Sequence, residues 1–503
     1  MLSEPTLPGS MPPGSMLPGS RGCAPPDASD RSGGPDDRRD ADSGGLSSLI
    51  ALAGQQATGS ATGSSSEGGV LSNILGGDTF WPAEPRSLRE AGLTAPMLES
   101  LICKLLLTVG QLSGRQIAER LALPFAVFEP VFSDLRTRKV ISYNGSAPLG
   151  DYNYVLTEQG LTLARSYRDA CAYVGPAPVP LEDYVLSVEA QAVGDVAVRK
   201  HDLAEALADV SVEPSLFDLL GPAVNSGSGM FLYGAPGNGK STLAERMCRC
   251  YGQSIWIPRT IIDDGEIIKL YDPAYHLPVT AGDPYGQAKE SSSDGRWIRV
   301  RRPTVIVGGE LTMDSLELRH DARSGVSMAS LQMKSNCGCL LIDDFGRQRM
   351  EPAELLNRWI IPLEDRRDFL TLATGKKIEV PFEQLILFST NLAPEDLVDE
   401  AFLRRIPYKI AIDDPGEEEF LRLFRLAAEA IDCDCDDDAV EYLLATHYRP
   451  HGRALRRCHP RDLLGQLASI CEYDGQPFAM SPAHIDRVAA SYFTAVPTKP
   501  ATT

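Results

Sequence analysis

The stretch Met230-Phe-Leu-Tyr-Gly234-Ala-Pro-Gly-Asn-Gly239-Lys240-Ser241-Thr242 decides the fold of this chain. A short apolar strand runs into the pattern Gly-x-x-x-x-Gly-Lys-Ser, and the helix-forming run Leu243-Ala-Glu-Arg-Met follows. Backbone N–H groups of such a loop surround a phosphate, its lysine bridges two phosphates, and its serine hydroxyl binds Mg²⁺. A chance match would not bring the strand and the helix that the motif requires. The residues expected to bind nucleotide are Gly234, Ala235, Pro236, Gly237, Asn238, Gly239, Lys240, Ser241 and Thr242.

The composition sets the class of protein. With 503 residues, 43% of them hydrophobic, the chain can hold two to four domains with cores of their own. A formal net charge of -20 argues against a protein that coats nucleic acid or anionic membrane through its global field, although a local basic patch could still bind one. There is no apolar run of about 18 residues and no secretory signal, so we expect a cytoplasmic protein without membrane insertion.

The 11 cysteines include three Cys-x-Cys pairs, at Cys248/Cys250, Cys337/Cys339 and Cys433/Cys435. Each pair has a structural explanation: a helix, an apolar strand and an acidic helix start, respectively. The Cys-x-x-Cys spacing of a zinc site does not occur in the sequence. We therefore expect neither a metal-cysteine site nor structural disulfides.

The N-terminal part of the chain changes character near residue 86. Residues 1–85 are rich in Gly, Pro, Ser and Asp, which predicts a disordered tail. Residues 86–172 instead read as three amphipathic helices followed by a hairpin with a Gly/Pro turn. This order resembles a winged helix-turn-helix domain. Residues 173–205 are expected to be a linker.

The winged domain raises the question of its partner. DNA would be recognised by the helix from Phe125 to Arg138 entering a major groove. That helix carries many apolar residues, however, and its cations cluster late, at Arg136, Arg138 and Lys139. The segment has ten Lys/Arg against eight Asp/Glu, a weak basic footprint. Both DNA and a protein partner therefore stay open for 86–172.

Two more apolar strands end in polar groups, as ligand-facing strands of a doubly wound sheet do. The run Cys339-Leu-Leu-Ile ends in Asp343, expected in the Mg²⁺ shell, and Asp344, expected to orient and deprotonate the attacking water. The run Gln384-Leu-Ile-Leu-Phe-Ser-Thr ends in Asn391, whose amide could read the γ-phosphate.

Two arginines follow that strand. By their spacing, Arg404 and Arg405 do not fold back easily onto their own phosphate loop, so we expect one of them to act on a neighbouring subunit. Surface salt bridging is the alternative for the pair.

Together these motifs and the helical tail resemble the AAA+ ATPases over about 205 to 495. The resemblance implies ATP and Mg²⁺ as cofactors and a three-layer P-loop α/β domain over 206–412 with a helical lid over 413–495. It also implies a second sensor arginine in the lid, for which Arg461 matches. Many relatives carry Asp-Glu where this chain has Asp343-Asp344. Asp-Asp occurs in replication-initiator and helicase-loader relatives, which leaves hydrolysis open to test.

The segment from Phe369 to Pro381 reads as a hairpin around Thr374-Gly-Lys-Lys. It resembles the hairpin before the first sensor strand in the branch with magnesium chelatase and sigma-54 activators, which use it to engage a substrate. The long stretch 261–336 is expected to hold pore or partner-binding loops, or else a solvated insertion strand.

The whole chain is similar to bacterial proteins described as predicted ATPases with chaperone activity, some linked to Flp pilus assembly. The runs Val307-Gly-Gly-Glu-Leu-Thr and Ile342-Asp-Asp-Phe-Gly-Arg-Gln348 carry this likeness. The primary hypothesis is thus an ATP-hydrolysing ring, with six subunits expected, that remodels an unknown protein partner. The alternatives are a DNA-binding regulator or loader, and a nucleotide-dependent scaffold that scarcely hydrolyses ATP.

Overall fold

The computed structural model describes residues 80–193, 197–210, 212, 214–251, 254–279, 293–433 and 435–493. The chain divides into a unit Met1–Ser65 and a unit Ser66–Thr503. The disorder predicted for 1–85 falls, up to residue 79, outside the described residues.

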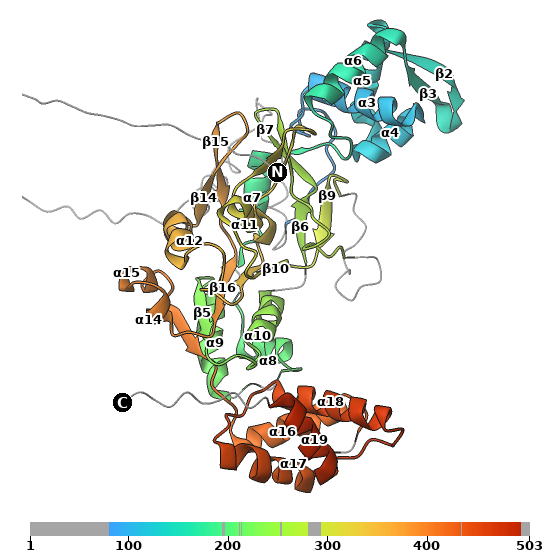
Figure 1. The fold of residues 1–503 in the computed structure, drawn as a ribbon. Helices are drawn as coiled ribbons and strands as arrows, with labels where there is room; N and C mark the ends of the chain where they lie inside the picture. The colour runs from blue at the N-terminus through green and yellow to red at the C-terminus, as the bar shows by residue number, and fades with distance from the viewer. Residues whose placement is uncertain are drawn as a thin grey trace, which may run out of the picture. The chain divides into compact units, whose positions relative to one another are not determined.

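A five-stranded parallel sheet forms the centre of the larger unit (Figure 1). Its strand order is β10-β13-β16-β5-β17, and all four pairings are parallel. The three inner strands, β13, β16 and β5, are buried along most of their length, as expected of a parallel sheet that is covered on both faces, while the edge strands β10 and β17 are partly exposed. The five strands have the bounds Thr304–Val307, Cys339–Ile342, Leu385–Thr390, Met230–Tyr233 and Tyr408–Ala411 in the order of the sheet.

Helices cover both faces of this sheet and make three layers. On one face, α9 (Pro214–Asn225) and α10 (Lys240–Met247) pack against alternate strand residues such as Leu232. On the other face, α12 (Pro352–Arg358) and the buried Trp359 pack against the strand residues that point to that side, such as Phe388. The predicted three-layer α/β fold with a parallel sheet is therefore confirmed.

A second, mixed sheet occupies the stretch where loops or an insertion strand were expected. Its order is β11-β12-β8-β7-β4, with a separate pair β6-β9 beside it. The bounds are Arg319–Asp321, Val326–Met328, Glu266–Lys269, Thr260–Asp263 and Val179–Pro180, then Ile255–Pro258 and Trp297–Val300. Residues 280–292 of this stretch lie outside the described residues. The rest of 261–336 belongs largely to a folded insertion and the core strand β10.

The segment 173–205, expected to be a linker, is instead built into the fold. Strand β4 pairs with β7, and Tyr184 and Val188 of α7 (Leu181–Glu189) lie in the core of the insertion. Leu203 of α8 (Lys200–Ala206) packs into the core of the central domain. The expectation missed these contacts because a two-residue strand has little sequence signal and its partner lies some 80 residues away.

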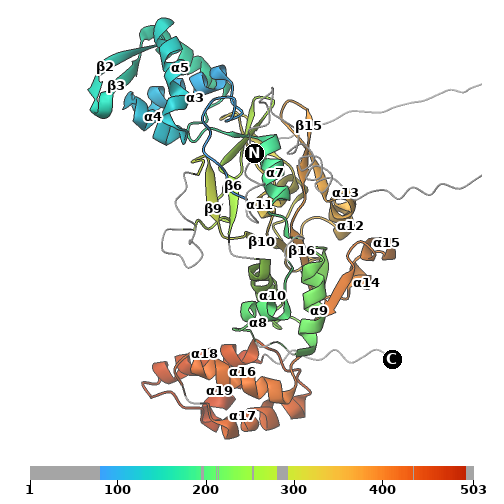
Figure 2. The ribbon, with the colours of Figure 1, turned by 180° about the vertical axis from the view of Figure 1, so that it is seen from behind.

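The predicted hairpin is confirmed. Strands β14 (Arg367–Thr371) and β15 (Lys377–Pro381) pair antiparallel, with Thr371 opposite Lys377 beside the turn. Both views show the hairpin close to α12 and α13 (Ile360–Asp365) (Figures 1 and 2). One face of the hairpin is buried in the core of the insertion, while Phe369 on the other face is 45% exposed.

The N-terminal domain (86–172) has the three predicted helices and the predicted hairpin, and it adds a fourth helix and a short strand that were not predicted. The helices are α3 (Ala95–Val109), α4 (Gly114–Leu121), α5 (Phe125–Thr137) and α6 (Glu158–Ala170). Strands β1 (Gln111–Ser113), β3 (Asp151–Leu156) and β2 (Ile141–Ala147) form an antiparallel sheet in the order β1-β3-β2. A capping box of Ser113 and Gln116 starts α4, because each side chain accepts from the other residue's backbone N–H. The name winged helix for this arrangement stays a prediction.

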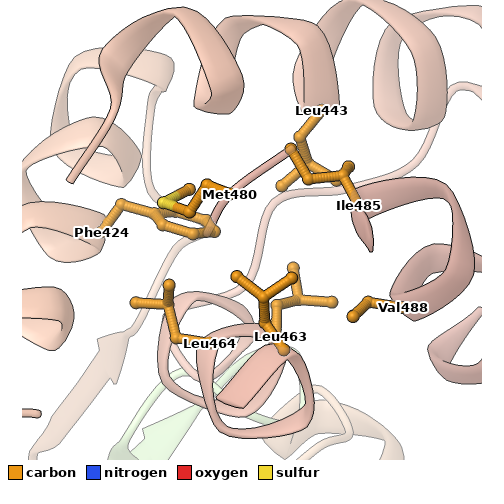
Figure 3. Close-up of a pocket in the computed structure, with 8 residues that line it drawn as sticks. Phe424, Leu443, Leu463, Leu464, Met480, Ile485 and Val488 are labelled. Carbon is orange, nitrogen blue, oxygen red and sulfur yellow. The ribbon is translucent and has the colours of Figure 1, made fainter. Parts of the chain in front are cut away.

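The C-terminal helical domain consists mainly of α16 (Glu417–Glu429), α17 (Asp437–Leu443), α18 (His459–Tyr473) and α19 (Pro482–Tyr492). Its core closes around a wholly apolar cavity of about 20 Å³, to which Phe424, Leu464 and Met480 contribute (Figure 3). So small a space without polar partners is a packing gap and not a ligand site.

Within the described residues, no helix has both the length and the apolar character to cross a bilayer. The nine cysteines described in the structure are free thiols, and these ranges hold no group of three or more His, Cys, Asp or Glu side chains suited to a metal.

Candidate functional site

The phosphate loop leaves the end of β5 at Gly234 and enters α10 at Lys240. Gly234 has φ +134°, and a Cβ there would lie 2.4 Å from the carbonyl oxygen of Ile412. Gly237 has φ +84°, and a Cβ there would lie 2.6 Å from the sulfur of Cys458. These two glycines are required by the left-handed backbone and by the close approach of other chain segments.

Lys240 points back over its own loop. Its ammonium donates to the carbonyl oxygens of Gly234 and Ala235, both at 3.1 Å, and to Asn391 Oδ1 at 2.8 Å. Burial lowers the pKa of Lys240, and the negative charges of Asp343 and Asp344 oppose that effect. A cation held this way, with its charge only partly compensated, is suited to an anionic ligand such as a phosphate.

Ser241 and Asp343, the two predicted metal ligands, lie side by side. The Ser241 hydroxyl donates to Asp343 Oδ2 at 2.8 Å, which joins the first turn of α10 to the end of β13. A hydroxyl and a carboxylate are hard oxygen donors of the kind Mg²⁺ takes beside a nucleotide, so the residues present fit that ion.

Asp344, which follows β13, and Asn391, which follows β16, are hydrogen-bonded to each other beside this pair. Asn391 Nδ2 donates to Asp344 Oδ1 at 3.1 Å, while its oxygen accepts from Lys240. Asp344 has φ +50°, in the left-handed region that few non-glycine residues other than Asn and Asp adopt. The structure thus brings together the predicted lysine, metal ligands, water-activating carboxylate and sensor amide.

The two predicted arginines differ in their surroundings. Arg405 Nε donates to Glu364 Oε1 of α13 at 2.7 Å. Arg404, directly after α15 (Glu400–Leu403), is exposed, and none of the described residues forms an ion pair with its guanidinium. The ion pair of Arg405 with Glu364 therefore does not involve the phosphate loop.

The helical domain touches the loop through residues that the sequence did not single out. Asn238 Nδ2 donates to Asp414 Oδ1 at 2.7 Å, and Arg456 forms an ion pair with the same carboxylate. Cys458 N donates to the carbonyl oxygen of Gly237 at 2.9 Å. A signal existed, because Arg456 and Arg457 directly precede Cys458, the N-cap residue of α18.

Arg461, the residue predicted as the lid sensor, lies on the first turn of α18. Its side chain is 82% exposed and pairs with the neighbouring Asp462, with Nη2 3.1 Å from Oδ1. The described contacts therefore bring Arg456, and not Arg461, beside the phosphate loop.

Comparison with known proteins adds partial likenesses. Residues 416–491 match a family model described as a domain of unknown function (DUF8689), which spans the helical domain. No curated protein matches the sequence. Among solved structures, NtrX from Brucella abortus is 14% identical, with a TM-score of 0.37 over 58% of this chain and 57% of that chain. RuvB, the Holliday junction branch migration motor of Thermotoga maritima, is 13% identical, with a TM-score of 0.30 over 58% of this chain and 68% of that chain.

The chain thus spans little more than half the length of the NtrX chain. The fold assignment rests on the strand order and the phosphate loop of the chain itself.

Proposed function

We propose that this chain binds and hydrolyses ATP with Mg²⁺. The observation that carries the proposal is the meeting of Lys240, Ser241, Asp343, Asp344 and Asn391 at the ends of three adjacent strands. These side chains supply a cation, two oxygen ligands for Mg²⁺, a carboxylate and an amide within hydrogen-bond reach of one another. Phosphoryl transfer needs that set, because its catalysis is mostly positioning and charge stabilisation.

Each residue has a defined role in this proposal. Lys240 would exchange the two loop carbonyls for nucleotide phosphates, and Ser241 and Asp343 would hold Mg²⁺, whose chemistry is to stabilise negative charge on the phosphates. Asp344 orients a water molecule and takes its proton. Asn391 fixes Asp344 through its nitrogen and reads the γ-phosphate.

The working state is proposed to be a homo-oligomeric ring of six subunits in the cytoplasm. Exposed Arg404 supports this, because an arginine without an ion-pair partner among the described residues can reach the nucleotide of a neighbour. The ring would remodel a protein partner, as a chaperone does, in pilus or secretion work. The hairpin β14-β15 and the insertion sheet that holds it are the surfaces offered to that partner.

A DNA-binding regulator or loader is the second candidate. The observation that favours it is the pair of exposed cations, Arg136 and Lys139, at the end of α5. A scaffold that binds ATP and scarcely hydrolyses it is the third outcome to distinguish.

Steady-state ATP turnover across protein concentration tests the proposal, with Lys240→Ala and Asp344→Asn as matched variants. We expect activity per subunit to rise with concentration, as shared sites require. Lys240→Ala should lose nucleotide affinity, while Asp344→Asn should bind ATP and not hydrolyse it. A Lys240→Ala protein that binds ATP normally would remove the site assignment. A wild-type protein that binds ATP but shows no turnover would favour the scaffold.

A further inference from the structure

A concave surface of about 470 Å³ lies where α5 ends and β2 begins in the N-terminal domain. Hydroxyl and cationic side chains dominate its lining, and no carboxylate takes part. The lining residues are Ser133, Arg136, Thr137, Lys139, Ile141, Ser142, Tyr143 and Thr157. The hydroxyls of Thr137 and Thr157 already donate to the backbone carbonyl oxygens of Ser133 and Lys139. The two cations beside the Ser133 and Ser142 hydroxyls still form a surface suited to a phosphate group.

The two lining cations keep their charge available. Arg136 and Lys139 are exposed, and none of the described residues forms an ion pair with either. Arg138, between them in sequence, is different: it donates to both oxygens of Glu99, at 2.7 and 2.8 Å, and to Asp134 at 2.9 Å. These hydrogen bonds raise the pKa of Arg138 and occupy its donors. The positive field at the surface therefore comes from Arg136 and Lys139.

An aromatic stack continues from the concave surface onto the hairpin. The guanidinium of Arg136 lies 4.1 Å from the ring centroid of Tyr143. The Tyr143 ring in turn stacks on the Tyr152 ring, with 4.1 Å between the ring centroids and 27° between the ring planes. Tyr143 is 40% exposed and Tyr152 is 44% exposed. A cation and two stacked rings next to a phosphate site are the arrangement on which unpaired bases stack.

The outward face of α5 lacks that character. Glu129, Pro130 and Asp134 are exposed along it, so the helix would bring carboxylates toward the phosphates of a duplex major groove. The cations and rings lie instead at the end of the helix and on β2-β3. This separation favours a flexible single strand over a duplex.

We propose that this surface binds single-stranded nucleic acid. Arg136 and Lys139 hold a backbone phosphate in the concave surface, and an adjacent base continues the stack on Tyr152. The binding does not depend on ATP hydrolysis, so it can be present or absent whatever the ATPase measurements show.

Fluorescence anisotropy of the full chain with labelled dT20 tests the proposal, without nucleotide and in EDTA. A duplex of the same length and a poly-glutamate chain are the competing probes. The variants are Arg136→Ala, Lys139→Asn and Tyr152→Ala. Asn suits position 139 because Lys139 has φ +56°, where Asn is tolerated. The matched control is Arg120→Ala, an exposed cation of the same domain outside the concave surface.

We expect each of the three variants to weaken dT20 binding by roughly tenfold, and Arg120→Ala to leave it within about twofold. Arg136→Ala should also flatten the dependence of affinity on salt by about one phosphate contact. The proposal is overturned if dT20 does not bind or if duplex binds more tightly. It is also overturned if Arg120→Ala costs as much as Arg136→Ala. If poly-glutamate displaces dT20, and Tyr152→Ala binds dT20 as tightly as the wild type, the partner would be an acidic protein instead.

Discussion

The ammonium of Lys240 lies 2.8 Å from the side-chain oxygen of Asn391, across the boundary between two neighbouring strands. The other end of the same amide donates to Asp344. The phosphate-binding cation and the carboxylate proposed to activate water are therefore linked through one side chain. A change in how Lys240 is engaged can reach Asp344 without moving a strand.

Asn391→Ala is expected to lower ATP turnover by roughly 100-fold, the cost of losing one positioned donor in an active site. ATP affinity should stay within about threefold, because Lys240 and the loop N–H groups remain. Turnover and fluorescent-nucleotide binding measure the two effects. Leu392→Ala, at the exposed neighbouring position, is the control and should leave both unchanged. Equal losses in binding and turnover would contradict a role confined to the reaction.

Asp344→Asn should remove hydrolysis and keep the fold. The carboxylate is replaced by an amide that cannot take a proton, which predicts a loss of about 10² to 10⁴ in turnover. The backbone at φ +50° suits Asn, so melting temperature should not fall. Asp344→Ala removes the same charge and adds a left-handed strain of about 1 kcal/mol. Residual turnover near the wild-type rate in both variants would show that another group activates the water.

The two arginines after α15 should separate into one functional and one structural residue. Arg404→Ala is expected to reduce turnover on the order of 10³-fold with ATP binding and stability preserved. Arg405→Ala should cost less than about 1 kcal/mol of stability, since it breaks a partly exposed pair with Glu364. Mixing Arg404→Ala with Lys240→Ala subunits provides the test of action across a boundary. Restored turnover in the mixture supports it, and inactivity at every ratio argues against it.

The parts of the site that could be predicted are those encoded locally. The strand, loop and helix around Lys240 are contiguous, and polar residues at the ends of apolar runs meet at one sheet edge because the strands are parallel. The predictions that failed concern contacts between segments far apart in the sequence. The pairing of Val179 with Ile261 turned an expected linker into part of a sheet, and no local pattern marks it. Strands of three or four residues gave the insertion a similarly weak signal.

The choice of lid arginine meets a related difficulty. Which arginine faces the loop depends on where α18 begins, at His459, and on the chain path before it. Arg456 precedes the helix and reaches Asp414, whereas Arg461 on the first turn points to solvent.

Arg456→Ala is therefore expected to weaken ATP binding by about 10- to 100-fold, as the loss of a charge-assisted contact to phosphate would. Arg456 must leave Asp414 to make that contact. Arg461→Ala is the matched variant, and its nucleotide affinity should stay within about twofold. Fluorescent-nucleotide titrations of both proteins compare them. A larger effect at Arg461 would restore the sequence-based choice and show that the helical domain moves when nucleotide binds.

The helical domain should lose stability as pH falls from about 6.5 to 4, because of His459. Burial, aided by the charge of Arg456, lowers the pKa of His459 to about 4, although Asp462 and Asp414 oppose the shift. Its Nδ1 lies 2.8 Å from the hydroxyl of Tyr448, which can donate to the neutral ring. Between the folded pKa of about 4 and the ordinary pKa of 6.5, the His459 ring binds a proton in the unfolded chain but not in the folded chain. The folded state therefore becomes less stable as the pH is lowered.

The loss from His459 should reach at most about 3 kcal/mol near pH 4 and be absent above pH 7. Calorimetry of the full chain from pH 7 to 4.5 would follow the transition of the helical domain. His459→Gln should flatten this dependence, since glutamine fills similar space and takes up no proton. His451→Gln, at an exposed histidine of the same domain, should leave it unchanged. If His459→Gln keeps the full pH dependence, the destabilisation arises from other groups. The imidazole of His459 then only fills space in the core and has no role in acid sensitivity.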